Sequence, residues 1–162
     1  MKREYLNDVL DALKTVSALR WIDADEGQLD YYNDGERPPV AFPCCLVELG
    51  IPGVQPLSEL GAEGPCRCIL RATLQVAFDD CATLEARTPT SVREVAFRRF
   101  DLLEEVRRAL DGRWFEGALQ PWTRTSCMPR KRDDGLKLYD THTLIYAAYS
   151  STGKTYWGKK SK

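Results

Sequence analysis

Apolar and polar side chains alternate without a break from Cys66 to Phe78. A period of two predicts an extended strand, with one face on a core and the other on water or a neighbouring surface. The face predicted to meet the core carries Cys66, Cys68, Leu70, Ala72, Leu74, Val76 and Phe78, and the opposite face carries Arg67, Arg71, Thr73 and Gln75. At about 13 residues, this strand exceeds twice the usual length of roughly 5–6. We therefore expect part of its surface to serve another molecule.

Two segments show the helical period. The first runs from about Arg3 to Val16, where apolar residues recur every three or four positions. The second follows Pro89, where Ser91 and Glu94 have the spacing of a capping box, and Gly112 marks its end. Its predicted apolar face consists of Val92, Val95, Ala96, Phe100, Leu103, Val106 and Leu110.

The segment between the first helix and the long strand is predicted to hold two further strands. Leu19–Ile22 is short, and Val40–Leu49 is an apolar run in which Pro43 indicates a bulge or an edge position. Asp23–Pro39 is predicted to be mostly loop, with an extended piece at Gln28–Tyr32. Ile51–Gly64 contains three glycines and two prolines and is predicted to be loop, with one helical turn around Leu57–Leu60.

The last third of the chain predicts a long hairpin. Strands at Thr123–Lys131 and Leu136–Tyr149 flank the sequence Asp133-Asp134-Gly135, which favours a tight turn. The second of these strands is apolar on both faces near its end, as expected for a central strand or for one that meets another subunit. The whole pattern predicts an α+β fold, in which two helices pack on a mainly antiparallel sheet with a long strand and a long C-terminal hairpin.

Composition supports one globular domain over residues 1–150, followed by a polar, basic tail at 151–162. Hydrophobic residues make up 43% and charged residues 29% of the 162 residues. No apolar run approaches the roughly 18 residues of a membrane span, and the start has no signal-peptide core. We therefore expect a soluble protein that is made in the cytoplasm and contacts no membrane.

Charge is distributed unevenly along the chain. Residues 1–81 contain 7 Lys and Arg against 14 Asp and Glu, whereas residues 82–162 contain 16 against 10. If the fold separates these halves in space, the acidic side of one copy could meet the basic side of another. The alternative is a well-mixed, solvated surface.

No catalytic or metal-binding motif is complete. The six cysteines include no C-x-x-C pair, and we expect them to be reduced, small hydrophobic residues. Ser151–Thr155 resembles the end of a phosphate-binding loop, but Ala148 stands where the first glycine is required. His142 could pair with Asp140 two positions earlier on a strand, although no nucleophile or oxyanion site is marked. A small enzyme that uses His142 with an acid or a thiol is one alternative function.

A nucleic-acid-binding module is a second alternative. Arg124, Arg130, Lys131, Arg132 and Lys137 cluster around the predicted hairpin, with Trp122 and Tyr139 nearby. Basic residues interleaved with aromatic ones can bind single-stranded nucleic acid by charge and stacking. The same residue types are also favoured at protein interfaces, and the net charge of −1 favours a protein partner.

The order of elements resembles the tail terminator, or tail-completion, proteins of long-tailed bacteriophages. The matching features are the helix Glu4–Val16, the strand Pro39–Val47, the long strand Cys66–Phe78, the helix Val92–Leu110 and the closing hairpin around Asp133-Asp134-Gly135. The resemblance covers most of the chain and rests on element order and length. Head–tail connectors and other neck or minor tail proteins share the pattern nearly as well. Six cysteines and the acidic stretch Asp23–Asp34 depart from it.

The resemblance implies a structural virion protein of the tail or neck, assembled in the host cytoplasm. Such a subunit forms a hexameric ring that caps the tail tube and joins it to the head. Its partners would be further copies of itself, the tail tube protein and a head-completion or connector protein, with DNA at most passing through the lumen. Neither enzymatic activity nor a cofactor is implied. On this basis we expect Cys66–Phe78 and Leu136–Tyr149 to contribute to contacts between copies. The candidate interface residues are Arg67, Arg71, Thr73, Gln75, Arg130, Lys131, Arg132, Tyr139, Ile145 and Tyr149.

Overall fold

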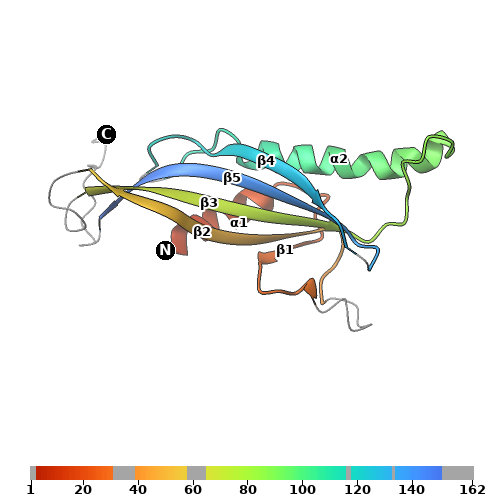
Figure 1. Ribbon diagram of the computed structural model, residues 1–162, viewed down its shortest axis with the longest axis horizontal. Helices are drawn as coiled ribbons and strands as arrows, with labels where there is room; N and C mark the ends of the chain where they lie inside the picture. Colours follow the sequence, from red (N-terminus) through yellow and green to blue (C-terminus); the bar gives the residue numbers. More distant parts are fainter. Residues whose placement is uncertain (1–2, 31–38, 58–64, 116–117, 133, 151–162) are drawn as a thin grey trace.

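The computed structural model describes residues 3–30, 39–57, 65–115, 118–132 and 134–150. These residues form helices and strands in the order α1 (Arg3–Leu13), β1 (Trp21–Ala24), β2 (Cys44–Pro56), β3 (Pro65–Phe78), α2 (Thr90–Leu110), β4 (Thr123–Arg130) and β5 (Lys137–Ser150). The strands belong to one mixed, mostly antiparallel sheet (Figure 1), which confirms the predicted α+β class. The predicted tail at 151–162 lies outside the described residues.

The sheet has the strand order β1-β2-β3-β5-β4, in which only the β1–β2 pair is parallel. β3 and β5 pair along their whole lengths, from Pro65 opposite Ser150 to Phe78 opposite Lys137. Both are central strands, as predicted for the last strand, and β4 pairs with the other edge of β5 from Leu138 to Leu144. Where both edges are paired, a contact with another molecule must use side chains on a face of the sheet.

Both helices cover one face of the sheet, which we call the inner face. The alternation of β3 places its apolar side chains there, and Leu70, Ala72, Leu74 and Val76 are at most 1% exposed. They pack with the apolar stripe of α1 and the second half of α2 in the main core. The predicted assignment of the two faces of β3 is therefore confirmed.

A smaller core lies on the opposite, outer face at one end of the sheet. The connection between β1 and β2 crosses this end and buries Leu29, Val40 and Phe42 against Leu136 and Leu138. Val40–Pro43 was predicted to belong to the strand, but β2 begins at Cys44, directly after Pro43. Proline cannot donate a ladder hydrogen bond, which fits a strand that starts after it. Residues 25–30 form no strand, and the rest of the predicted extended piece falls outside the described residues.

The far half of β2 contradicts the loop predicted from Ile51 onward. β2 continues to Pro56, and Val54, Gln55 and Pro56 pair with β3 beyond a register shift between Gly50 and Gly53. Pro52 and Gly53, two of the residues that indicated a loop, lie at this bulge. The predicted helical turn at Leu57–Leu60 falls mostly outside the described residues.

α2 extends past the end of the sheet (Figure 1), so its first half has no strand beneath it. We call Thr90–Phe100 the overhang. Its predicted apolar face is wrong at Val92, Val95 and Phe100, which are 40%, 42% and 45% exposed. The prediction holds further along the helix, where Leu103 and Val106 are buried.

The ends of the helices also differ in part from the prediction. α1 ends at Leu13 rather than Val16. Pro89 precedes α2 and no side chain caps its first turn, so the predicted capping box of Ser91 and Glu94 is absent. Gly112 adopts a φ of 80° directly after the helix, as expected for a glycine that ends one.

Candidate functional site: the open face of the sheet

The outer face of the sheet has no helix on it in the described part of the chain. Strand register brings the outward-pointing side chains of β3, β5 and β4 side by side over most of the length of the sheet. We call this surface the open face. It consists of Arg67, Ile69, Arg71, Thr73 and Gln75 from β3, Asp140, His142, Leu144 and Tyr146 from β5, and Ser126, Met128 and Arg130 from β4.

Polar contacts across the strands fix several of these side chains. Thr73 Oγ1 lies 3.3 Å from His142 Nδ1, and Arg130 Nε donates to Asp140 Oδ2 at 2.8 Å. Gln75 donates its side-chain amide to Asp25, which ties the connection after β1 to the outer face. Cross-strand pairs of this kind hold side chains in defined positions. The middle of the open face is therefore ordered and polar.

Arginine and apolar groups share the rest of this surface. The Arg67 guanidinium lies 5.7 Å from the centre of the Tyr146 ring and donates to Gln55 at 2.7 Å. Arg71 faces Gly50 on one side and Leu144 on the other, and no ion pair of its side chain occurs within the described residues. Met128 is 63% exposed at the β4 edge. Arg, Tyr and Met are enriched at protein interfaces.

The candidate interface residues divide between the two faces. Five of them lie on the open face, but Thr73 is only 8% exposed: Arg67, Arg71, Thr73, Gln75 and Arg130. Ile145 points into the main core and is 0% exposed, so a neighbouring molecule cannot reach it. Tyr139 also lies on the inner face, with its ring 6.1 Å from those of Phe78 and Phe100. The side chain of Tyr149 is outside the described part of the structure.

The basic hairpin uses much of its charge within the chain. Arg132 donates to the Leu29 carbonyl at 2.9 Å and to Asp134 at 2.7 Å, and it lies 3.7 Å from Asp30. Arg124 lies 3.7 Å from Glu104, and Lys131 is exposed. β1, β2 and β3 belong to the acidic half of the chain and form one edge of the sheet, whereas β5 and β4 belong to the basic half and form the other edge. The acidic connection after β1 nevertheless reaches the basic hairpin. The charges of the two halves are therefore partly paired inside one copy.

No metal-binding cluster occurs among the described residues, and His142 and Asp140 do not pair with each other. No three His, Cys, Asp or Glu side chains converge there as metal ligands. His142 contacts Thr73, whereas Asp140 accepts from Arg130. Burial raises the pKa of the Cys44 thiol to about 12 and also raises that of Cys45, which suits inert core thiols rather than nucleophiles.

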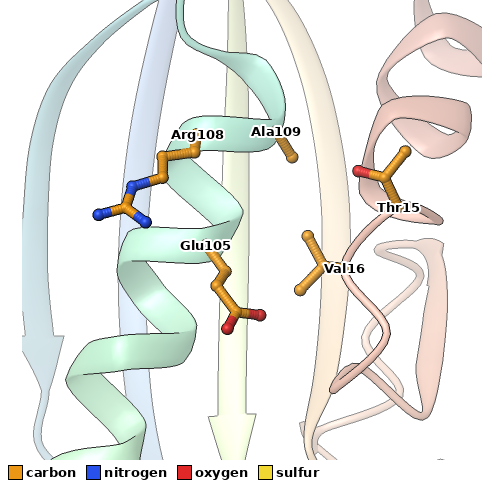
Figure 2. Close-up of a pocket in the computed structure, with 5 residues that line it drawn as sticks. All are labelled: Thr15, Val16, Glu105, Arg108 and Ala109. Carbon is orange, nitrogen blue, oxygen red and sulfur yellow. The ribbon is translucent and has the colours of Figure 1, made fainter.

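A shallow pocket of about 280 Å³ lies between the end of α1 and the last turns of α2. Figure 2 shows Thr15 and Val16 on one side and Glu105, Arg108 and Ala109 on the other, with the Arg108 guanidinium pointing away from Val16. A binding site for a small molecule usually needs an enclosed apolar cavity with a few converging polar groups. This pocket is a depression in the surface and has neither an enclosed apolar cavity nor a set of converging polar groups.

The sequence interpretation missed the exposed apolar surface of the overhang. Val92 and Val95 fit the helical stripe of a buried face, and sequence spacing alone gave no sign that the sheet ends before them. The off-stripe position of Phe97, which is 43% exposed, was the available signal.

Comparison with models of known protein families found no match, and comparison with curated protein sequences found no similar protein. In the part of the chain that is described, no helix is long and apolar enough to cross a membrane. Arguments about function therefore depend on the geometry of this chain itself.

Proposed function

We propose that this protein is a structural virion subunit that forms a ring, acting as the tail terminator or a closely related neck component of a long-tailed bacteriophage. The ring caps the tail tube and joins the tail to the head. The observation that carries the proposal is the open face, a surface with three arginines and Tyr146 that runs along three strands without a covering helix.

The shape of the sheet supports contact with other protein molecules. A two-layer α+β domain normally buries one face of its sheet and leaves the other to water, and antiparallel sheets tolerate this arrangement. Here the exposed face includes Ile69, Leu144 and Tyr146, which are half-buried, as well as the more exposed Met128. Contact with a partner would remove this mixed surface from water while leaving the inner core intact.

The edges of the sheet favour side-chain contacts over continuation of the strands from one copy to the next. The edge strand β4 carries a register shift between Arg124 and Ser126 and contains Pro129, and β2 carries a bulge and Pro52. Bulges and prolines are devices that prevent edge-to-edge pairing. Copies in a ring built from this subunit therefore contact each other through side chains on their surfaces. The rotation that relates one copy to the next sets the number of copies in the ring.

The experiment is polymerisation of the tail tube protein encoded in the same genome, with and without this protein added. We expect the added protein to stop tube growth and to shorten the tubes in proportion to its concentration. Arg71→Glu should weaken this capping because Arg71 lies exposed on the open face. Arg113→Glu provides a matched control, since Arg113 is also exposed but lies between α2 and β4. Tube growth unaffected by the unmutated protein at any concentration would contradict the proposal.

A further inference from the structure

The smaller core on the outer face of the sheet lies beneath the connection between β1 and β2. We call the two described pieces of this connection, residues 25–30 and 39–43, the strap. Three apolar side chains of the strap, Leu29, Val40 and Phe42, are 2–8% exposed. They pack with side chains of the sheet and the hairpin, namely Cys44, Leu46, Ala77, Leu136 and Leu138. Among the described residues, none from either helix belongs to this core.

The sheet separates this outer core from the main core. Cys44 and Cys45 are neighbours in β2 and are both 0% exposed, yet Cys44 belongs to the outer core and Cys45 to the main core. Because side chains alternate between the two faces of a strand, removal of the strap would uncover Cys44 and leave Cys45 buried. The two adjacent thiols therefore report separately on the two cores.

The strap covers an apolar end of the outer face that continues the open face. Ala77 follows Gln75 on the same face of β3, and Leu46 lies directly opposite Gln75 on β2. Leu138 precedes Asp140 on the same face of β5. The covered positions are apolar, whereas the middle of the open face is polar. Without the strap, the open face would gain an apolar strip of the kind that marks contact sites.

Few hydrogen bonds join the first piece of the strap to other elements. Arg132 donates to the Leu29 carbonyl at 2.9 Å, and Gln75 donates to Asp25 at the start of the strap. In the described part of the chain, every other hydrogen bond of residues 26–30 is local to the turn after β1. Segments held by few contacts to other elements are typical of units that open without global unfolding.

The hairpin between β4 and β5 holds Arg132 in place for this contact. The Arg132 guanidinium donates to Asp134 at 2.7 Å and lies 3.7 Å from Asp30. The side chains of Arg132 and Asp134 are only 11% and 8% exposed, and Asp134 also accepts from the Leu136 backbone N–H at 3.1 Å. Hydrogen bonds that involve charged groups are stronger than neutral ones. One arginine side chain therefore fastens the strap to the hairpin.

We propose that the strap is a cover that opens as a unit while the main core stays folded, and that Arg132 holds it closed. Opening breaks the hydrogen bond from Arg132 to the Leu29 carbonyl and withdraws three apolar side chains from the outer core. It also adds the covered apolar strip to the open face. The closed strap therefore keeps other molecules from this end of the sheet. The opening is a property of the chain alone and does not depend on the proposed role in a phage tail.

Thiol labelling of the full chain in urea tests the proposal. A Cys81→Ser background removes the exposed thiol, and N-ethylmaleimide is added at urea concentrations that leave the circular dichroism unchanged. Fragment-ion mass spectrometry distinguishes label on Cys44 from label on Cys45. Burial raises the pKa of both thiols, to about 12 for Cys44, so neither reacts readily in the closed state. We expect Cys44 to react roughly tenfold faster than Cys45, because opening the strap costs less than global unfolding. Equal rates at Cys44 and Cys45 throughout the urea series would overturn the proposal, since the strap would then open only with the whole fold.

Variants of the arginine test what holds the strap closed. Arg132→Met should raise the labelling rate of Cys44 about tenfold, as expected for the loss of a hydrogen bond from a charged donor, and leave Cys45 protected. Arg130→Met is the matched control, because Arg130 also pairs with a carboxylate, that of Asp140, but lies on the open face away from the strap. Equal effects of the two substitutions on Cys44 would overturn the assignment of Arg132.

A second variant keeps the test decisive if Arg132→Met does not fold. Leu29→Ala removes apolar contacts from the outer core and no charge. It should also speed the labelling of Cys44 and leave Cys45 protected. A rate at Cys44 unchanged by Leu29→Ala, or raised equally at both thiols, would overturn the separate opening of the strap.

Discussion

Replacement of buried Arg99 by methionine should destabilise the fold more than replacement of the neighbouring exposed Arg98. Methionine keeps most of the length of the side chain but removes the guanidinium. Asp80 then loses two charge-assisted hydrogen bonds, one of them at 2.7 Å from Arg99 Nε, and the Ala82 carbonyl loses its donor.

The magnitude follows from the burial of the pair. Removing one partner of a fully buried ion pair costs about 3–5 kcal/mol, and each hydrogen bond to a charged group contributes roughly 1.5–3 kcal/mol. The Arg99 side chain is 6% exposed but that of Asp80 is 28% exposed, so water can partly solvate the abandoned carboxylate. We therefore expect a loss of about 2–3 kcal/mol in the free energy of unfolding, or roughly 5–10 °C in Tm for a chain of this size.

The pH dependence provides an independent check. The hydrogen bonds from Arg99 hold the pKa of Asp80 below its ordinary value. A carboxylate with a lowered folded pKa stabilises the protein fully above its unfolded pKa of about 3.9, and this contribution is lost as pH falls through the folded value. The advantage of the unmutated protein over Asp80→Asn should therefore be constant between about pH 5 and 7 and shrink below about pH 4.

Urea denaturation followed by circular dichroism measures these differences. Arg98→Met is the matched control because Arg98 is the adjacent residue and is exposed. We expect this control to stay within about 0.5 kcal/mol of the unmutated protein, as surface changes usually do. If Arg99→Met were as stable as Arg98→Met, the claim that this pair fastens the loop after β3 to α2 would be refuted.

Three further predictions concern the core, the open face and the cysteines. Leu74→Ala should lower the free energy of unfolding by about 2–5 kcal/mol in the same urea assay, because Leu74 is 1% exposed in the main core; a loss under 1 kcal/mol would contradict its placement. Arg71→Glu should leave Tm within about 2 °C while weakening self-association in sedimentation experiments, whereas Arg113→Glu should change neither. In the folded protein, a maleimide dye should label exposed Cys81 quickly and leave buried Cys44 unlabelled until urea is added; fast labelling of Cys44 would contradict its burial.

Local patterns predicted much of the fold. The alternation along β3 predicted which side chains face the core because one buried face imposes a period of two on any strand. The stripe of α1 and the glycine after α2 worked for similar local reasons. Where β2 ends depends instead on its neighbour, because pairing with β3 holds the chain extended through Pro52 and Gly53 despite their loop-like character.

Features that depend on distant parts of the chain could not be predicted. Val92 and Val95 belong to a helical stripe, but whether a sheet lies beneath them is decided by the end of β3 at Phe78. The placement of Ile145 on the inner face follows from the register between β3 and β5, which no local motif sets. The open face was only partly anticipated. Its β3 residues follow from alternation, whereas His142 and Tyr146 join it through pairing across the sheet.

Negative-stain electron microscopy of tail tubes mixed with the purified protein tests the central claim most directly. The account predicts a ring of several copies at one end of each tube. A protein that remains monomeric at high concentration, and leaves both tube ends bare, would contradict it.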